Sequence, residues 1–329
     1  MILGLDIGGA NTKAAASDGQ LCRSVYLPLW KGAPLDEVLD RLAEDRRRIE
    51  AAALAVVITG ELADCYGSKR EGVQSLMAAV KRAFDCPIFF WSTSGFSWKD
   101  PLELAAANWS ASAAFLARDV GDCLFVDMGS TTTDLIPVRS GQMPAPRTDF
   151  MRLAAGELVY MGLLRTRLDA ILPVARLGGK RIALAPEFFA IMADARLVLD
   201  GISAERYTCD TADGAGKDRS SALRRLARTA CADIEEIGEA GALAIARQAC
   251  RRQSSILAAA IKRLAERHDL ARIAAAGIGE GLIAEAAERL GLECIRLSRT
   301  YGQSISDVFP AYAVARLAEA DMNANSKRI

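Results

Sequence analysis

Short apolar runs alternate with amphipathic stretches along the first third of the chain. In order, the pattern predicts strands at 2–7, 13–17 and 24–29, a helix at 35–50, a strand at 54–60, a helix at 70–84, a strand at 87–92 and an alanine-rich helix at 100–118. Strands that alternate with helices are typical of an α/β fold.

The remaining chain repeats this opening and then becomes mainly helical. From residue 123, a strand, an Asp-Gly loop and a second strand recur, which indicates an internal duplication. We expect mainly helical structure over 151–206, a polar exposed loop at 207–221, helices at 222–237, 239–267 and 282–290, a strand at 271–277 and a closing helix at 304–320. Two lobes around a cleft are therefore predicted: 1–122 plus 310–329 for the N-terminal lobe, and 123–309 for the C-terminal lobe, with a helical insertion around 150–267.

Composition narrows the class of partner. The 329 residues exceed the length at which a single core usually divides. Lys plus Arg and Asp plus Glu both number 41, so no basic field favours nucleic acid or an anionic membrane, and the expected ligands are small molecules. Eight scattered cysteines and the lack of a long apolar stretch predict a reduced, cytoplasmic protein. The oligomeric state stays open.

The first candidate site is the loop GLDIGGANTK at 4–13. Its glycines permit a tight turn, its polar side chains can donate to phosphate oxygens, and its lysine adds positive charge. Asp6 is a candidate metal ligand and catalytic residue, and the predicted phosphate-binding residues are Gly8, Gly9, Asn11, Thr12 and Lys13. The alternative is an ordinary hairpin whose lysine points to solvent.

The second candidate site is the loop FVDMGSTTTDLIPV at 125–138. Asp127 lies 121 positions after Asp6 (127 minus 6), at the matching place in its loop. Asp127 and Asp134 are candidate ligands of a hydrated Mg²⁺. The predicted phosphate-binding residues here are Gly129, Ser130, Thr131, Thr132 and Thr133. The alternative is a threonine-rich strand edge with an N-capping aspartate.

A third glycine-rich turn, GIGEG at 277–281, follows an apolar run and precedes a helix. Gly277, Gly279 and Gly281 would let a ligand lie against the backbone at the helix N-terminus. An ordinary strand-to-helix turn explains the same residues.

Taken together, these motifs resemble a known superfamily. Two Asp-Gly loops, an alanine-rich helix before the second, the GIGEG turn and the closing PAYAVARL helix resemble the actin, sugar kinase and Hsp70 proteins. Within them, DMGSTTTDLIPV is similar to the hydantoinase/oxoprolinase branch. The segments GLDIGGANTK, AAANWSA, DMGSTTTDLIPV, GELVYMGLLRT and YTCDTADG resemble a short form of that branch linked to tetrahydromethanopterin-dependent one-carbon transfer.

This resemblance implies a fold and a reaction. The fold would be a two-lobed, duplicated ribonuclease H-like α/β structure. Archaeal members of the short form join an aminomethylfuran diphosphate to the phenol of γ-glutamyltyramine, so the implied activity is an ether-forming transfer that releases pyrophosphate during methanofuran or methylofuran synthesis. The first loop departs from the DVGGTFTD of true hydantoinases, because Asn11, Thr12 and Lys13 stand at its end. ATP-driven ring opening is therefore not expected, and a lysine where the hydrolase has an acid favours gripping a diphosphate over completing a metal site.

Several residues receive roles from the implied reaction. Mg²⁺ and Lys13 would stabilise the leaving pyrophosphate, and a carboxylate would accept the phenol proton. Asp6, Glu61, Glu157 and Asp210 are candidates for that proton acceptor, with Glu61 and Glu157 preferred. Capping or solvated carboxylates are the alternative. The candidate substrate-binding residues are Asn108, Asp210, Thr211 and Asp213, although the last three could equally form a solvated turn.

Two other functions remain possible from the sequence. An ATP-dependent kinase or hydrolase would use the same loops, so ATP is an open but less favoured ligand. A nucleotide-dependent structural or regulatory protein would also share the fold, but no DNA-binding helix pair or peptide-binding domain accompanies it here.

Overall fold

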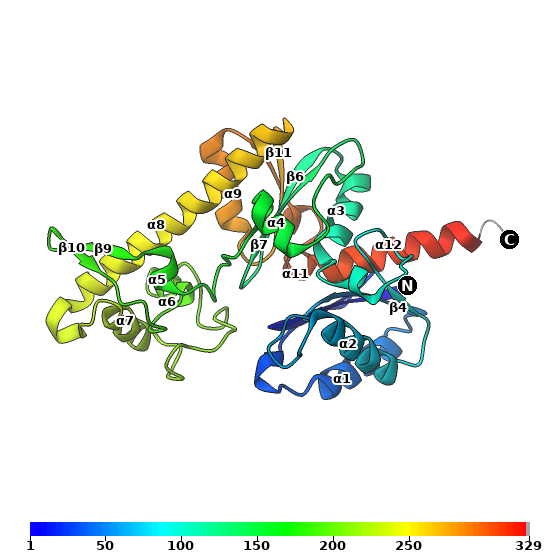
Figure 1. Cartoon of the computed structure of the whole chain (residues 1–329), viewed down its shortest axis with the longest axis horizontal. Coiled ribbons are helices and arrows are strands. Elements are labelled where there is room, and N and C mark those ends of the chain that lie inside the picture. The colour runs from blue at the N-terminus through cyan, green and yellow to red at the C-terminus, as the bar shows by residue number, and fades with distance from the viewer. Residues whose placement is uncertain (327–329) are drawn as a thin grey trace.

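The computed structural model describes residues 1–326 as two lobes built around separate five-stranded sheets (Figure 1). The first sheet has the order β3-β2-β1-β4-β5 and contains β1 (Ile2–Gly8), β2 (Asn11–Ala16), β3 (Cys22–Tyr26), β4 (Ala53–Thr59) and β5 (Ile88–Phe90). The second has the order β12-β11-β6-β7-β8 and contains β6 (Cys123–Met128), β7 (Thr133–Val138), β8 (Leu158–Val159), β11 (Arg272–Ala276) and β12 (Glu293–Arg296).

The two sheets repeat one topology. In each, the first three strands form an antiparallel meander, the fourth pairs in parallel with the first, and the fifth pairs in parallel with the fourth. The predicted two-lobed α/β fold and its internal duplication are therefore confirmed.

A helical layer joins the lobes. Helix α12 (Phe309–Ser326) packs against β1, β2, β4 and α3 (Asn108–Asp119), and side chains from both sheets share one apolar core with these helices. Gly4 makes this approach possible, because a Cβ there would lie 1.9 Å from the Ala311 carbonyl oxygen. The C-terminal helix therefore packs on the N-terminal sheet, although the predicted domain boundaries themselves stay a prediction, and residues 327–329 of the predicted lobe lie outside the described residues.

Other helices cover the outer faces. In the first lobe these are α1 (Leu35–Arg48) and α2 (Lys69–Ala83), with short 3-10 helices at Leu29–Lys31 and Pro101–Leu104. Helix α2 begins where the Ser68 side chain accepts a hydrogen bond from the Glu71 N–H, which satisfies one exposed donor of the first turn. In the second lobe, α9 (Glu280–Leu290) packs on β6, β11 and β12. By contrast, α10 (Leu297–Thr300) contributes Leu297 to the core shared by both sheets, and α11 (Gln303–Asp307) contacts β3 and α12.

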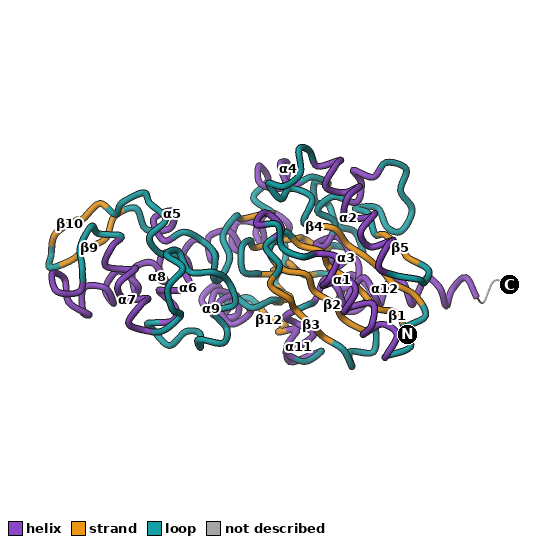
Figure 2. The backbone as a smooth tube through the Cα atoms, turned by 90° about the horizontal axis from the view of Figure 1, so that it is seen from below, coloured by secondary structure: helices purple, strands orange, loops and turns teal. Residues whose placement is uncertain are grey.

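An elongated insertion extends from the second lobe to one side (Figures 1 and 2). It contains α5 (Leu168–Ile171), β9 (Val174–Leu177), β10 (Lys180–Ala183), α6 (Met192–Leu197), α7 (Arg219–Arg228) and much of the long helix α8 (Ile234–His268), whereas α4 (Asp149–Ala155) lies beside β8 on the second lobe. The mainly helical prediction for 151–206 is wrong, because short strands and loops occupy most of that segment.

Two predicted helices have different limits. The helix expected over 222–237 ends at Arg228, and α8 begins at Ile234 with a break at Gly238, whose φ of 66° and ψ of 169° are not helical. The helix expected over 100–118 starts only at Asn108, because Ala106 adopts a left-handed backbone with φ of 50°. The expected boundary at 238 coincides with the break at Gly238, but the propensity pattern revealed neither the helix end at Arg228 nor the late start at Asn108.

Within residues 1–326, no helix is both long enough and apolar enough to cross a membrane. All eight cysteines lie in this part of the chain and are free thiols.

Candidate active site

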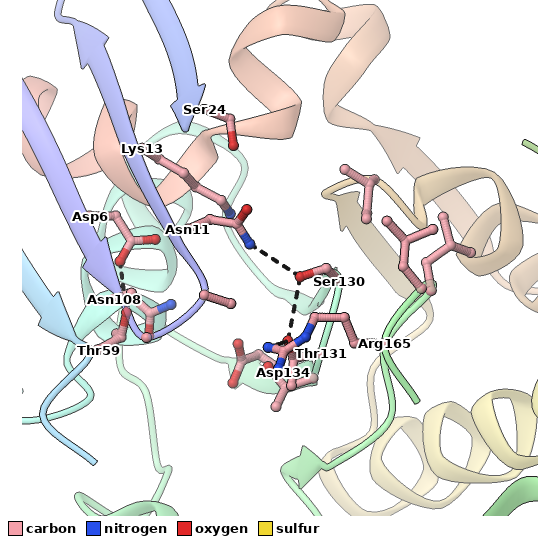
Figure 3. Close-up of a pocket in the computed structure, with 18 of the residues that line it drawn as sticks. Asp6, Asn11, Lys13, Ser24, Thr59, Asn108, Ser130, Thr131, Asp134 and Arg165 are labelled. Carbon is pink, nitrogen blue, oxygen red and sulfur yellow. Dashed lines mark hydrogen bonds between the residues drawn. The ribbon is translucent and has the colours of Figure 1, made fainter. Parts of the chain in front are cut away.

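A cavity of about 750 Å³ lies between the two Asp-Gly loops. Residues from both loops line it, together with side chains from β4, α3, α4 and the insertion. The loops face one another closely enough for the Asn11 amide to donate to the Ser130 hydroxyl across the cavity at 3.3 Å. Figure 3 shows this bond with Asp6 and Lys13 on one side and Thr131 and Asp134 on the other. The structure therefore brings the two predicted loops together.

Each loop turns its carbonyl groups away from the cavity. In the first loop, Gly9 and Ala10 accept hydrogen bonds from the N–H groups of Leu29 and Leu27, while their own N–H groups donate to no acceptor in the described chain. In the second loop, the carbonyls of Gly129 and Ser130 accept from the N–H groups of residues 163–165. The N–H groups of residues 130–132 likewise donate to no acceptor in the described chain. Paired loops with unengaged amides form a cradle suited to an anion.

Two buried threonines support the loops from beneath. Thr12 pairs in register with Ile7, and Thr133 with Met128, so they occupy matching positions. The Thr133 hydroxyl donates to the Met161 carbonyl at 2.6 Å, whereas the Thr12 hydroxyl is buried without a partner in the described chain. Neither side chain lines the cavity. Their predicted phosphate contact stays a prediction.

Two carboxylates, those of Asp6 and Asp134, line the base of the cavity, and Asp127 is buried behind them without lining it. Asp6 accepts a hydrogen bond from the Thr59 hydroxyl at 2.9 Å, and Asp127 pairs in register with Asp134. Burial raises the pKa of the Asp6 carboxyl, and the positive charge of Lys13 opposes that rise. Burial also raises the pKa of Asp127 to about 7, with Lys13 again acting in the opposite direction.

These carboxylates fit a hydrated divalent cation. In the described chain, Oδ1 of Asp127 is buried without a hydrogen-bond partner. No group of three His, Cys, Asp or Glu side chains among residues 1–326 forms a metal cluster by itself. Mg²⁺ commonly retains several waters and needs only one or two carboxylates plus phosphate oxygens, so this donor set is sufficient for it.

Asp134 is already engaged by a buried arginine. Arg152 of α4 is 1% exposed, donates to Asp134 Oδ1 and forms a second ion pair with Asp149 at 3.0 Å. The Arg152 guanidinium also lies 4.7 Å from the centre of the Trp109 ring. One oxygen of Asp134 is therefore committed to the protein. Asp6, which lines the cavity, is the better candidate for direct cation contact, whereas Asp127 does not line it and would be reached through a water of a hydrated ion.

Glu61 lines the cavity just beyond the end of β4. Its side chain is 2% exposed, and its Oε2 atom has no hydrogen-bond partner in the described chain. Burial raises the pKa of Glu61 to about 7, while its own backbone N–H, Lys69 and the Ala106 backbone oppose the rise. Ala106, with its left-handed φ, also lines the cavity. An unpaired carboxylate poised near neutral pH can accept a proton.

Glu157, the other preferred candidate, is placed differently. Burial raises the pKa of its carboxyl, but the side chain does not line this cavity. Its carbonyl oxygen accepts a bond from the Leu135 N–H. Of the two preferred candidates, Glu61 lines the cavity and Glu157 does not, and the identity of the proton acceptor stays a prediction.

The third glycine turn lies behind the second loop. A Cβ at Gly277 would lie 2.3 Å from Asp127 Oδ1, and one at Gly279 would lie 2.4 Å from the Met128 sulfur. Of residues 277–281, Ile278 lines the cavity, while Gly277, Gly279 and Gly281 do not. Close packing against Asp127 and Met128 explains the first two glycines, and the predicted ligand contact of this turn is not supported.

The predicted substrate loop is tied into the protein. Asp210 accepts hydrogen bonds from the Tyr26 hydroxyl at 2.9 Å and the Lys31 ammonium at 2.8 Å, both from the other lobe. Asp213 pairs with Arg225, and Thr211 donates to the Ala215 carbonyl. The side chains of Asp210, Thr211 and Asp213 do not line the cavity. Asn108, at the start of α3, does line it.

Arg165 and Trp30 are among the cavity residues that the sequence reasoning missed. Arg165 donates to the Thr131 hydroxyl at 3.1 Å, and its guanidinium lies 4.4 Å from the centre of the Trp30 ring. Arg165 belongs to the segment GELVYMGLLRT, but nothing in the sequence indicates that it meets a tryptophan 135 positions earlier (165 minus 30). A contact between lobes leaves no local signal.

Known proteins place the chain in a family. The family model for hydantoinase/oxoprolinase matches residues 53–321. A Methanocaldococcus jannaschii protein named (4-{4-[2-(gamma-L-glutamylamino)ethyl]phenoxymethyl}furan-2-yl)methanamine synthase is 38% identical over 98% of this chain and 99% of its own length. A Methanococcus vannielii protein of the same name is 32% identical over 66% of this chain and all of its own.

Solved structures show the same fold at low identity. A ROK family glucokinase from Streptomyces griseus, in complex with glucose and AMPPNP, has a TM-score of 0.50 at 14% identity and covers 97% of this chain and 99% of its own. Acetone carboxylase in a nucleotide-free structure has a TM-score of 0.50 at 13% identity, over 93% of this chain and 51% of its own. These likenesses establish the sugar kinase type of fold and nothing of the ligand. With the matched family model and the near full-length relative, the chain belongs to the hydantoinase/oxoprolinase family.

Proposed function

We propose that this protein is a transferase that joins the methylene carbon of an aminomethylfuran diphosphate to the phenol oxygen of a glutamylated tyramine or tyrosine and releases pyrophosphate. The compound named in both relatives contains this phenoxymethyl-furan ether. The reaction would serve the synthesis of a methanofuran-type or methylofuran cofactor for tetrahydromethanopterin-linked one-carbon metabolism in the cytoplasm.

One observation carries the proposal from the side of the structure. A single cavity contains both the facing loops with unengaged amides and, on its wall, the unpaired carboxylate of Glu61. A diphosphate in the cradle would place its bond to carbon inside the same cavity as a proton acceptor. A transfer at carbon needs these two elements and no covalent enzyme intermediate.

The first half of the reaction is departure of the diphosphate. The bond between the furan methylene and the diphosphate oxygen breaks, and its electron pair leaves with the diphosphate. The unengaged amides of both loops and Lys13 would stabilise the charge that develops there. When bound between Asp6 and Asp127, Mg²⁺ would neutralise further charge on the phosphate oxygens. The furan ring disperses the positive charge that remains on the methylene.

The second half is attack by the phenol. The phenol oxygen forms the new bond to the methylene carbon while its proton passes to the Glu61 carboxylate. A free phenol has a pKa of about 10, so it gains from proton acceptance in the transition state. Since burial raises the pKa of Glu61 to about 7, the carboxylate is a stronger base than an exposed glutamate and is still ionised at mildly alkaline pH.

Product analysis tests the proposal. The purified protein is incubated with Mg²⁺, the aminomethylfuran diphosphate and either γ-glutamyltyramine or the matching tyrosine derivative. We expect stoichiometric pyrophosphate and an aryl ether of the expected mass. A parallel incubation replaces the furan diphosphate with ATP. Formation of ADP, without ether in the first incubation, would instead indicate the kinase or hydrolase alternative.

A further inference from the structure

Arg165 is fixed rigidly beside the second loop. The N–H groups of Leu163, Leu164 and Arg165 all donate to carbonyls of Gly129 or Ser130, at 2.9, 3.2 and 2.8 Å. Residue 162, which precedes Leu163, must be glycine for the two segments to approach this closely. A Cβ there would lie 2.4 Å from the Ser130 carbonyl carbon. The backbone of Arg165 therefore holds its place relative to the amides that form half of the cradle.

The side chain of Arg165 is also positioned before any ligand binds. Its guanidinium lies 4.4 Å from the centre of the Trp30 ring, and Nη1 donates to the Thr131 hydroxyl at 3.1 Å. Trp30 belongs to the other lobe, next to Lys31, which pairs with Asp210. Figure 3 shows Arg165 reaching toward Thr131 and Ser130 at the cavity. Stacking orients the planar group while its remaining N–H groups stay available to an anion.

The charge of Arg165 has no counterpart in the protein. Among the described residues, no carboxylate lies within ion-pair distance of it, although it lines a cavity that holds several. The neighbouring arginine differs, because Arg152 is neutralised by Asp134 and Asp149. Arg165 therefore presents an oriented guanidinium without a carboxylate partner, and it lies beside two hydroxyls and backbone amides that have no acceptor. Such a guanidinium can donate two parallel hydrogen bonds to the oxygens of one phosphoryl group.

We propose that Arg165 binds the outer phosphoryl group of the diphosphate, with Trp30 as the residue that positions its guanidinium. This inference rests on the proposed function for the identity of the diphosphate carrier, but the site itself requires only a diphosphate. Because Trp30 and Arg165 come from opposite lobes, the same contact holds the cavity closed around the leaving group.

Binding of inorganic pyrophosphate tests the inference without turnover. Calorimetric titration with Mg²⁺ and pyrophosphate compares the wild-type protein with R165Q, R165K and the matched control R167Q. Arg167 is two positions away, pairs with Asp169 at 2.7 Å and does not line the cavity. We expect R165Q to raise the Kd for pyrophosphate about 10- to 100-fold, as loss of charged hydrogen bonds would do. R165K should recover part of the loss, and R167Q should bind within about twofold of wild type.

Trp30 provides a second measurement. The variant W30A should raise the pyrophosphate Kd several-fold, and the double variant W30A/R165Q should bind no more weakly than R165Q alone, because the ring acts through the arginine. Additive losses would contradict a positioning role for Trp30.

Turnover then separates this inference from the proposed function. In the ether-forming assay, R165Q should raise the KM for the furan diphosphate and leave the KM for the phenol within about twofold. An unchanged pyrophosphate Kd in R165Q, an effect confined to the phenol KM, or Arg165-dependent binding of ATP without binding of pyrophosphate would each overturn the assignment. A wild-type protein that forms no ether but binds pyrophosphate through Arg165 would contradict the proposed function and support the diphosphate site.

Discussion

The two halves of the molecule carry the same loop on the same sheet but use it differently. Their strand orders match, and residues 6–13 correspond one by one to residues 127–134. Residues at equivalent positions of the two halves can therefore be compared. Where one side chain has all its hydrogen bonds within the protein and its counterpart has an unpaired atom, the first has a structural role and the second is available for chemistry. The duplication thus supplies an internal control for each functional assignment.

The glutamates after β4 and β11 show the contrast most clearly. Val57 pairs with Asp6, and Ala276 pairs with Asp127, so Val57 and Ala276 occupy equivalent positions 219 residues apart (276 minus 57). Glu61 and Glu280 are separated by the same 219 residues (280 minus 61) and are therefore equivalent too. Glu280 accepts hydrogen bonds from the Ser298 N–H and from the side chains of Ser298, Ser306 and Arg296. Glu61 keeps an unpaired oxygen at the cavity. The second half uses this carboxylate for structure, and the first half leaves it available for chemistry.

The residue opposite each loop aspartate differs in charge. Lys13 faces Asp6 in the first half, and Asp134 faces Asp127 in the second. Arg152 compensates Asp134 from α4, whereas the positive charge that opposes the rise in the pKa of Asp127 comes from Lys13 of the first half. Lys13 lines the cavity without a carboxylate within ion-pair distance among the described residues, which leaves its charge available to a ligand.

The largest effect is expected from the loop aspartates themselves. Asp127→Asn should abolish turnover, by about 10³-fold or more, because it removes the charge proposed to hold the cation near the leaving group. Folding should stay intact, since the substitution keeps the volume and removes a buried charge. Pyrophosphate release and the thermal midpoint measure the two outcomes. Asp6→Asn is the matched variant, and full activity in either variant would refute equal participation of the two halves.

The paired glutamates provide the next largest effect. Glu61→Gln should lower kcat about 10²- to 10³-fold through loss of the proton acceptor, without loss of stability. Glu280→Gln should instead lower the free energy of unfolding by about 2–4 kcal/mol, because it disrupts a buried network that includes Arg296. Activity per folded molecule should remain. Urea unfolding and kcat, measured on both variants, distinguish these outcomes, and a reversed pattern would exchange the two roles.

The pH dependence of stability isolates Glu61 from other groups. Because burial raises its pKa to about 7, the folded protein retains a proton that the unfolded chain releases near its ordinary value, so stability falls as pH rises between those two values. The difference in unfolding free energy between Glu61→Gln and wild type should therefore grow from pH 5 to pH 8 and then level off. Its size should be on the order of 2–3 kcal/mol. A difference that does not vary with pH would mean that Glu61 is ordinarily ionised.

The loops were predictable from sequence because their signal is local. An apolar strand, an aspartate and a turn of small polar residues are adjacent in the chain, and their recurrence 121 positions later predicts the duplication and the shared cavity. The closing helix was also predictable from its apolar and small residues, although its packing on β1 depends on Gly4 and Ala311, which are distant in sequence.

The remaining features depend on contacts between distant segments. Arg165 meets Trp30 only after the lobes associate, and Asp210 is occupied by Tyr26 and Lys31 only there. The sequence could therefore identify Asp210 as a polar loop residue but not its partners. The insertion was misread for a similar reason. Strand β9 pairs with β10 and packs on α8, so tertiary contacts rather than local periodicity decide the conformation of this segment.

The buried threonines give the smallest expected difference and test the comparison at its finest level. Thr133→Val removes the donor to the Met161 carbonyl and leaves that oxygen without its hydrogen bond, so it should cost about 1–2 kcal/mol of unfolding free energy. Thr12→Val removes a hydroxyl that has no partner in the described chain and should change stability by less than about 0.5 kcal/mol, or raise it slightly. Chemical denaturation of both variants measures the difference. Equal costs would show that the Thr12 hydroxyl has a partner in solution. Weaker pyrophosphate binding by Thr12→Val would then assign this hydroxyl to the phosphate site.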